Sequence, residues 1–137
     1  MQNFQLDPRL ENEGDKILDL KLSRVLLVDN ALFPWIILVP RIDNIKEIID
    51  LDKHNRSILM EEIGVISEAM IEVFSPYKLN VASLGNIVPQ LHVHVVARYI
   101  EDSAWPAPVF GKDKEAYAKE KYIAIKERLK KEIMSRI

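Results

Sequence analysis

The stretch Gln90-Leu91-His92-Val93-His94-Val95-Val96-Ala97-Arg98 decides the predicted fold. Polar and apolar residues alternate along its first half, and successive side chains of a β-strand point to opposite faces of the sheet. The face predicted to pack on the core carries Leu91, Val93, Val95 and Ala97. The opposite face carries Gln90, His92, His94, Val96 and Arg98. Two of the chain's three histidines therefore share one strand face, about 6.6 Å apart.

The segments before this strand predict an antiparallel meander over residues 17–40. Residues 17–22 alternate in part, and residues 24–28 and 35–39 are short apolar runs rich in β-branched side chains. An Asp-Asn turn separates the two runs, and Pro40 ends the second one. Residues 1–14 are polar with a few apolar anchors, which predicts an N-terminal arm or short helix that ends at Gly14.

The clearest predicted helix covers residues 51–74, with Asp50 as its N-cap and Ser75-Pro76 at its end. Its apolar stripe at helical spacing consists of Leu59, Ile63, Ile66, Met70 and Val73. Gly64 costs about 1 kcal/mol relative to alanine inside a helix, so we expect a close packing contact there. Residues 113–136 predict a second amphipathic helix at the C-terminal end.

Strands at 78–82 and 91–98, followed by a Trp- and Pro-containing loop at 102–112, complete the predicted order of elements. Strands, a helix, further strands and a last helix, joined by short turns, indicate an α+β fold rather than a parallel βαβ sheet. We expect one domain over residues 1–137, with an antiparallel sheet of about five strands, one long helix and a C-terminal helix.

Composition excludes several classes of protein. Nineteen Lys and Arg against 21 Asp and Glu give a net charge of −2, which argues against a nucleic-acid binder with a broad basic face. There is no cysteine, so neither a disulfide framework nor a cysteine zinc cluster is available. No apolar run reaches the roughly 18 residues that cross a membrane, and no secretory signal is recognisable. We expect a cytoplasmic protein.

The His-x-His pair is compatible with three kinds of role. Neutral imidazoles at His92 and His94 can both reach a divalent metal ion, although a third ligand is needed. A neutral imidazole can also attack phosphorus and form a covalent histidine–phosphorus bond. The third alternative is a pair of structural histidines on a half-buried strand. The spacing alone does not choose among the three.

The residues around the pair resemble the histidine triad (HIT) family of nucleotide hydrolases and transferases. The resemblance covers about residues 15–112, and it is to a bacterial subgroup similar to diadenosine tetraphosphate hydrolase-like HIT proteins. The matching strings are Pro34-Trp35, Leu-Val-Pro-Arg at 38–41, Leu-Gly-Asn…Pro-Gln-Leu-His-Val-His at 84–94 and Ala-Trp-Pro-Ala-Pro-Val at 104–109.

This resemblance implies catalytic roles for three residues. His92 matches the middle histidine of the triad, which attacks the α-phosphate of a nucleotide, and His94 matches the third, which helps to position the site. The first falls on Gln90, whose amide forms hydrogen bonds but does not titrate. A further histidine, common in the family after the Val-Pro-basic segment, is absent here, and Ile87 replaces a hydroxyl residue that often contacts phosphate.

The resemblance also implies a nucleotide-binding set. Asn86 matches the glutamine of the family's Gly-Gln turn, and Asn80 matches an asparagine near the phosphate. Asp29 or Asn30 matches the family residue that binds the ribose. The alternatives are an ordinary Asp-Asn turn at 29–30 and a solvent-facing amide at Asn80. We expect Arg98 at an edge or rim of the site and His54 facing solvent. We expect Trp105 to pack across a dimer partner, with closure over the substrate as the alternative.

The implied activity is hydrolysis or transfer at the α-phosphate of a purine nucleotide conjugate, of the dinucleoside polyphosphate or nucleoside phosphoramidate type. No cofactor is required for that chemistry, although Mg²⁺ can accompany a polyphosphate substrate. The family also implies a homodimer. Two alternatives remain open: a nucleotide-binding module with little or no turnover, and a metal-binding protein that uses His92 and His94.

Overall fold

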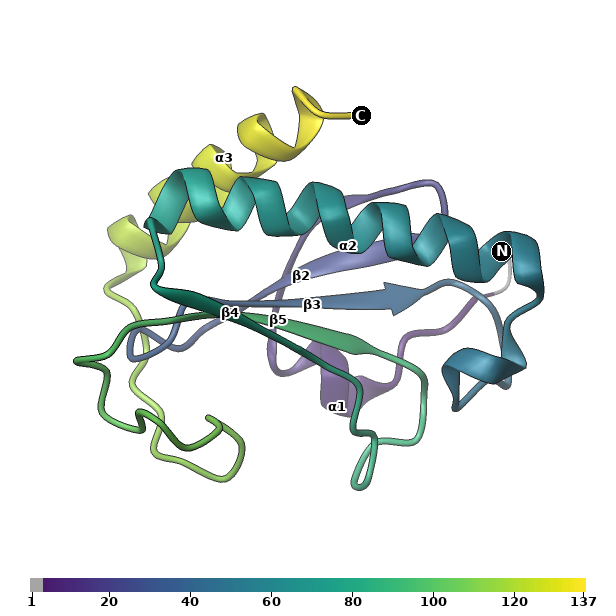
Figure 1. The fold of residues 1–137 in the computed structure, drawn as a ribbon, viewed down its shortest axis with the longest axis horizontal. Coiled ribbons are helices and arrows are strands. Elements are labelled where there is room, and N and C mark those ends of the chain that lie inside the picture. The colour runs from purple at the N-terminus through teal and green to yellow at the C-terminus, as the bar shows by residue number, and fades with distance from the viewer. Residues whose placement is uncertain (1–3) are drawn as a thin grey trace.

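Five antiparallel strands form a single sheet in the computed structural model, which describes residues 4–137 (Figure 1). The strands run in the spatial order β1-β2-β3-β5-β4. Their bounds are Gly14–Asp19 (β1), Ser23–Val28 (β2), Trp35–Pro40 (β3), Lys78–Ala82 (β4) and Val93–Arg98 (β5). The predicted α+β class, with an antiparallel sheet of about five strands, is confirmed.

Two helices, α2 (Lys53–Phe74) and α3 (Lys119–Met134), lie together on one face of this sheet (Figure 1). The short helix α1 (Pro8–Glu11) lies on the other side, and a 3-10 turn, η1 (Ile48–Asp50), precedes α2. Over residues 4–137, no helix has the length and apolar character needed to span a membrane. The sheet therefore has one face covered by long helices and one face covered by loops and α1.

Strand alternation places the core as the sequence predicts. The main core on the helix side includes residues of β5 and its approach, namely Leu91, Val93, Val95 and Ala97. On the opposite face, Ile37 is paired with His94, and Trp35 is paired with Val96. The face of β5 that carries the histidines is thus separated from the face that contacts α2.

A close approach of backbones explains Gly14, which begins β1 and does not end the N-terminal arm as expected. A Cβ atom at this position would lie 1.8 Å from the carbonyl oxygen of Leu27 on β2, so only glycine fits there. The first three residues of the predicted arm lie outside the described part of the chain, and the rest leads through α1 into this strand.

The helix boundaries differ from the prediction at both N-termini. The N-cap of α2 is Asp52, whose carboxylate accepts a hydrogen bond from the Asn55 N–H at 2.8 Å. The predicted cap, Asp50, instead accepts the N–H groups of Lys46 and Glu47 and stabilises η1. The C-terminal helix begins at Lys119, later than the predicted residue 113, because residues 113–118 form an irregular segment.

The expected close contact at Gly64 is wrong. Gly64 is exposed on α2, and a Cβ atom there would meet nothing within 4 Å. Nothing in the packing explains the glycine.

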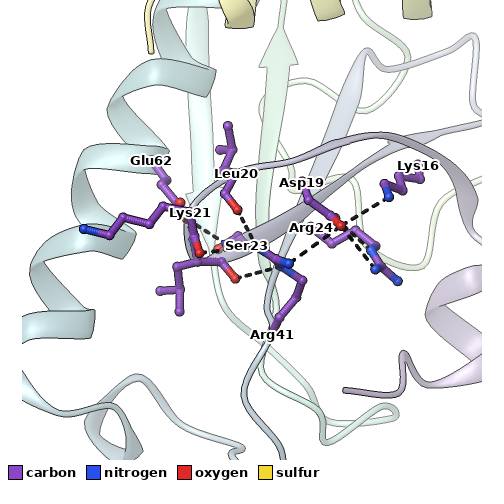
Figure 2. Close-up of polar contacts among 9 residues, drawn as sticks. Lys16, Asp19, Leu20, Lys21, Ser23, Arg24, Arg41 and Glu62 are labelled. Carbon is purple, nitrogen blue, oxygen red and sulfur yellow. Dashed lines mark hydrogen bonds and ion pairs between the residues drawn. The ribbon is translucent and has the colours of Figure 1, made fainter. Parts of the chain in front are cut away.

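The turn between β1 and β2 is held by Glu62 of α2, which is only 6% exposed (Figure 2). Its two carboxylate oxygens accept the backbone N–H groups of Leu22 at 2.8 Å and Ser23 at 3.1 Å. The sequence placed Glu62 off the apolar stripe of the helix, where a solvated side chain is the usual outcome. Burial is possible because the carboxylate satisfies two donors that the turn leaves without strand partners.

Arg41 completes the same turn from the end of β3 (Figure 2). Its guanidinium donates to the backbone carbonyls of Leu20, Lys21 and Leu22. Asp19 is paired with Arg24 at 2.9 Å and also contacts Arg41 and a lysine of β1. We call this set, with Glu62 and Ser23, the turn cluster.

Candidate functional site

His92 and His94 lie beside a cavity of about 370 Å³ on the sheet face opposite α2. We call this the histidine cavity. Its walls come from β3, the turn before β5, α1, the end of the Trp-Pro loop and the segment after it. They include Trp35, Asn86, Ile87, His92, His94 and Phe110. The strand register thus brings the two predicted histidines to a space that can hold a ligand.

The ring of His92 is fixed by one backbone hydrogen bond. Its Nδ1 lies 2.7 Å from the carbonyl oxygen of Gln90. A carbonyl oxygen only accepts, so Nδ1 carries the proton and the Nε2 lone pair is free for other chemistry. The side chain is 5% exposed and lines the cavity, which gives a held imidazole with an unprotonated nitrogen.

The ring of His94 has the opposite tautomer. The indole Nε1–H of Trp35 donates to His94 Nδ1 at 3.0 Å, so the His94 proton lies on Nε2. Burial, with a smaller effect from the neighbouring His92, lowers the pKa of His94 to about 4. At neutral pH, His94 is therefore an uncharged ring that presents an Nε2–H donor.

Aromatic rings hold this pair in place. The ring centroids of His92 and His94 are 4.8 Å apart, and Phe110 packs edge-on against His94 at 4.9 Å and against Trp35 at 5.6 Å. Edge-to-face contacts of this kind restrict ring orientation. Trp35 is in a string that the sequence singled out, but its bond to His94 depends on the β3–β5 register.

Asn86 is the one predicted nucleotide-binding residue that lines the histidine cavity. It lies in the turn that precedes β5, next to Gly85, which has a positive φ of 74°. The turn therefore brings an amide side chain to the same space as the two histidines. A left-handed glycine here allows the tight turn that presents it.

Asn80, on β4, lies on the same sheet face as the two histidines, but its side chain is hydrogen-bonded to Arg98. Its Oδ1 accepts a hydrogen bond from Arg98 Nη1 at 2.8 Å. Arg98 is 1% exposed and also pairs with Asp102 at 2.8 Å, so the expectation of a rim residue is wrong. Paired with Asp102 and Asn80, its charge can be buried. The same guanidinium holds the pKa of Asp102 down at about 2.

The other side of Arg98 faces the Trp-Pro loop. Its Nη2 donates to the carbonyl of Ala107, and its guanidinium lies over the ring of Trp105. Trp105 in turn packs edge-on against Tyr77. The packing expected for Trp105 was across a dimer partner, whereas these contacts are with Arg98 and Tyr77 of the same chain.

The two ribose candidates do not line the histidine cavity, although the Asp29 N–H donates to the carbonyl of the cavity residue Glu13 at 3.1 Å. Asp29 accepts the backbone N–H of Tyr117 at 2.9 Å and lines a separate polar cavity of about 440 Å³. Asn30 is 1% exposed, and its Oδ1 accepts the N–H of Leu32. Both residues are thus engaged in local structure between β2 and β3 and the start of α3.

The backbone carbonyl of Gln90 contacts His92, but the Gln90 side chain is hydrogen-bonded outside the pair of histidines. The carboxamide forms hydrogen bonds with Gln5 and Asp7 of the N-terminal segment. Sequence reasoning also did not identify Glu13 and Lys114, which line the histidine cavity and lie 3.5 Å apart. Neither belongs to a local motif, because the turn after α1 and the segment before α3 meet there only in the folded chain.

The described part of the chain adds no further ligand group to the metal alternative. Within residues 4–137, no three or more His, Cys, Asp and Glu side chains are grouped to hold a metal ion. The Nδ1 atoms of His92 and His94 are both in hydrogen bonds, which leaves Nε2 on each ring. His54 is exposed on α2, as expected, and borders a larger cavity of 590 Å³ that contains none of the predicted site residues.

Comparisons with known proteins place this site in context. The sequence model described as HIT domain matches residues 9–101. A histidine triad protein from Bradyrhizobium japonicum is 43% identical, with a TM-score of 0.92 over 95% of this chain and 98% of that one. One from Marinobacter aquaeolei VT8 is 41% identical, with a TM-score of 0.93 over 98% of each chain. A third, from Sinorhizobium meliloti 1021, is 36% identical, with a TM-score of 0.92 over 100% of this chain and 99% of that one. A search of curated proteins gives no significant match.

Proposed function

The chain belongs to the histidine triad (HIT) family. From this premise we propose that it is a hydrolase or nucleotidyl transferase that acts at the α-phosphate of purine nucleotide conjugates. The substrate class is a dinucleoside polyphosphate or a nucleoside phosphoramidate. The observation that carries the proposal is the geometry of His92, whose Nδ1 is hydrogen-bonded to the Gln90 carbonyl and whose side chain lines the cavity. In the neutral ring this hydrogen bond leaves the lone pair on Nε2.

In the proposed reaction, His92 Nε2 attacks the α-phosphorus in line with the leaving group. A nitrogen–phosphorus bond forms, and the bond from phosphorus to the leaving oxygen or nitrogen breaks with its electron pair. The proton on Nδ1 remains directed at the Gln90 carbonyl, which stabilises the positive ring of the nucleotidyl-histidine. Water then attacks phosphorus, releases the nucleoside monophosphate and restores the neutral ring.

His94 and Asn86 are proposed to bind the phosphoryl oxygens. The Nε2–H of neutral His94 is a donor that needs no counter-charge, and the Asn86 side chain supplies an amide donor from the turn before β5. Fixed donors stabilise charge that develops on oxygen without reorganisation. Water donates the proton that a leaving group needs, since the Gln90 amide does not titrate.

Lys114 is proposed to meet a second phosphate. It is a cation that lines the histidine cavity, and its contact with Glu13 is 3.5 Å with 65% of the lysine side chain exposed. Such a loose surface pair costs little to open. A polyphosphate chain that extends past His92 would gain the charge of Lys114, whereas a phosphoramidate with a neutral leaving group would not.

Turnover of a substrate panel tests the proposal. Adenosine and guanosine phosphoramidates and dinucleoside polyphosphates are incubated with the wild type, His92→Ala and His54→Ala. His54 is an exposed histidine outside the cavity and serves as the matched control. We expect His92→Ala to lose on the order of 1,000-fold or more in kcat while His54→Ala keeps wild-type rates. Equal turnover by wild type and His92→Ala would contradict the proposal.

A nucleotide-binding module with little turnover is the second candidate. It is favoured by Gln90, which removes a titratable group of the triad and is engaged with the N-terminal segment. In that case the wild type and His92→Ala bind nucleotide alike and neither turns over the panel.

The family also supports a homodimer in the cytoplasm, and we propose both. Strand β4 is at one edge of the sheet and has exposed residues Lys78 and Val81, so it can pair with a second sheet across a two-fold axis. No cofactor is proposed, and Mg²⁺ enters only with a polyphosphate substrate. Sedimentation equilibrium measures the dimer directly.

A further inference from the structure

The side chain of Gln90 is joined at both ends to one short stretch of backbone far away in sequence. Its Oε1 accepts the N–H of Asp7 at 2.8 Å, and its Nε2 donates to the carbonyl of Gln5 at 2.9 Å. We propose that Gln90 is a positioning residue that holds the N-terminal arm, residues 4–13, as one wall of the nucleotide site. This inference rests on the function proposed above for the histidine cavity.

The chemistry of the amide suits this role and that of imidazole does not. A carboxamide carries a C=O and an N–H on one carbon, as a peptide group does, so it can pair with the N–H and C=O of one extended segment. A neutral imidazole has one donor and one acceptor nitrogen, and these point away from each other across the ring. Glutamine at the first triad position therefore fits a chain whose N-terminal arm passes beside the motif.

The arm reaches the cavity itself. Leu10 and Glu13 line it together with His92, and Leu10 is only 2% exposed. Arg9 adds a second attachment, because its Nη1 donates to the carbonyl of Ile87, another cavity residue, at 3.0 Å. The arm is thus tied on one side to Gln90 and on the other to the turn that carries Asn86.

Gln90 links this wall to the nucleophile. Its backbone carbonyl accepts the Nδ1 proton of His92, while its side chain holds Gln5 and Asp7. One residue therefore sets both the ring that attacks and the wall against which the nucleotide lies. Loosening the side-chain contact is expected to affect binding more than the chemical step, since the backbone bond to His92 persists in any variant at position 90.

Hydrogen exchange and nucleotide binding together test this role. The variants are Gln90→Ala, Gln90→His and Gln90→Glu, which keeps the size and the acceptor but loses the donor. His54→Ala is the control, because His54 is exposed on α2 and does not line the histidine cavity. The probe for binding is adenosine 5′-monophosphate.

We expect the Asp7 amide to exchange about 10-fold faster in Gln90→Ala and Gln90→His, with amides of β3 and β5 unchanged. The Kd for the probe and the KM for substrate are expected to rise about 5- to 10-fold, while kcat changes by less than about 2-fold. Gln90→Glu is expected to lie between these variants and the wild type, and His54→Ala to match the wild type.

Three results would overturn the role. Unchanged protection of Asp7 in Gln90→Ala means that the side chain does not hold the arm. Faster exchange with an unchanged Kd means that the arm is not a wall of the site. A fall in kcat with unchanged exchange and Kd means that Gln90 acts in the chemistry. If the wild type binds no probe, the proposed function fails, whereas the exchange of Asp7 still decides whether Gln90 holds the arm.

Discussion

The turn cluster and the histidine cavity both bury polar side chains against the sheet, but they leave different atoms available. In the turn cluster, both oxygens of Glu62 accept backbone N–H groups and Arg41 donates to three backbone carbonyls. In the histidine cavity, each ring uses its Nδ1 in a hydrogen bond within the protein, and both rings line a space that can hold a ligand.

This difference separates a structural polar cluster from a chemical one. Buried charges that are fully hydrogen-bonded stabilise a turn but offer no atom to a ligand. Fixed rings with one nitrogen left over are already oriented for a ligand and lose little freedom when it binds. The two regions thus predict opposite responses to substitution: stability should fall at the turn, and activity should fall at the cavity.

The largest effect on folding is expected at Glu62. Glu62→Ala leaves the N–H groups of Leu22 and Ser23 buried without acceptors, so the free energy of unfolding should fall by about 3–4 kcal/mol. Its exposed neighbour Glu61 is the control, and Glu61→Ala should stay within about 0.5 kcal/mol of the wild type. Urea unfolding measures both. A loss below about 1 kcal/mol would show that the turn cluster is not structural.

The histidine cavity should respond to pH in a way that the turn cluster does not. The pKa of His94 falls from 6.5 to about 4 on folding, so the unfolded chain binds a proton more readily. The contribution of the His94 ring to the free energy of unfolding is fully present above pH 6.5. It is lost as the pH falls toward 4, by roughly 3 kcal/mol in total. His94→Gln should remove this part of the slope.

A nuclear magnetic resonance titration of the His94 ring checks the same prediction directly. The expected midpoint is near pH 4, with the proton on Nε2 at neutral pH. A midpoint near 6.5 would mean that the ring is solvated, and the contrast between the two regions would lose its electrostatic basis.

The smallest expected effect is at Ser23, the one imperfect member of the turn cluster. Its hydroxyl oxygen is buried and has no hydrogen-bond partner among residues 4–137. Ser23→Ala removes that group at little cost in volume, so stability should stay the same or rise by about 1 kcal/mol. Thermal unfolding checks this, and a clear loss of stability would reveal a hydroxyl contact that the cluster needs.

Sequence patterns predicted the sheet and the position of His92 and His94 on one face of it, because alternation along one strand fixes which side chains share a face. They failed where a charged side chain finds a partner far along the chain. Glu62 and Arg98 are buried by contacts to the β1–β2 turn and to Asp102, and no local pattern distinguishes them from solvated charges. The cap at Asp52 rather than Asp50 is an error of two residues between identical side chains.

The candidate site was predictable only in its motif. His92, His94 and Asn86 follow from the resemblance and line one cavity. Leu10, Glu13, Phe110 and Lys114 come from segments that meet only after folding, so their presence in the wall had no sequence signal. The contacts of the Gln90 side chain were not predictable either, because its partners are the backbone N–H of Asp7 and the backbone carbonyl of Gln5. Every residue except proline offers both backbone groups, so the sequence does not single these two out.

Mass spectrometry of the intact protein, quenched within milliseconds of mixing with an adenosine phosphoramidate, tests the central claim most directly. The account predicts one adenylyl group on the wild type, acid-labile and mapped to the peptide that carries His92, and none on His92→Ala. Turnover without an adduct on any residue, or an adduct on His94 in place of His92, would contradict the assignment of the free His92 Nε2 as the attacking atom.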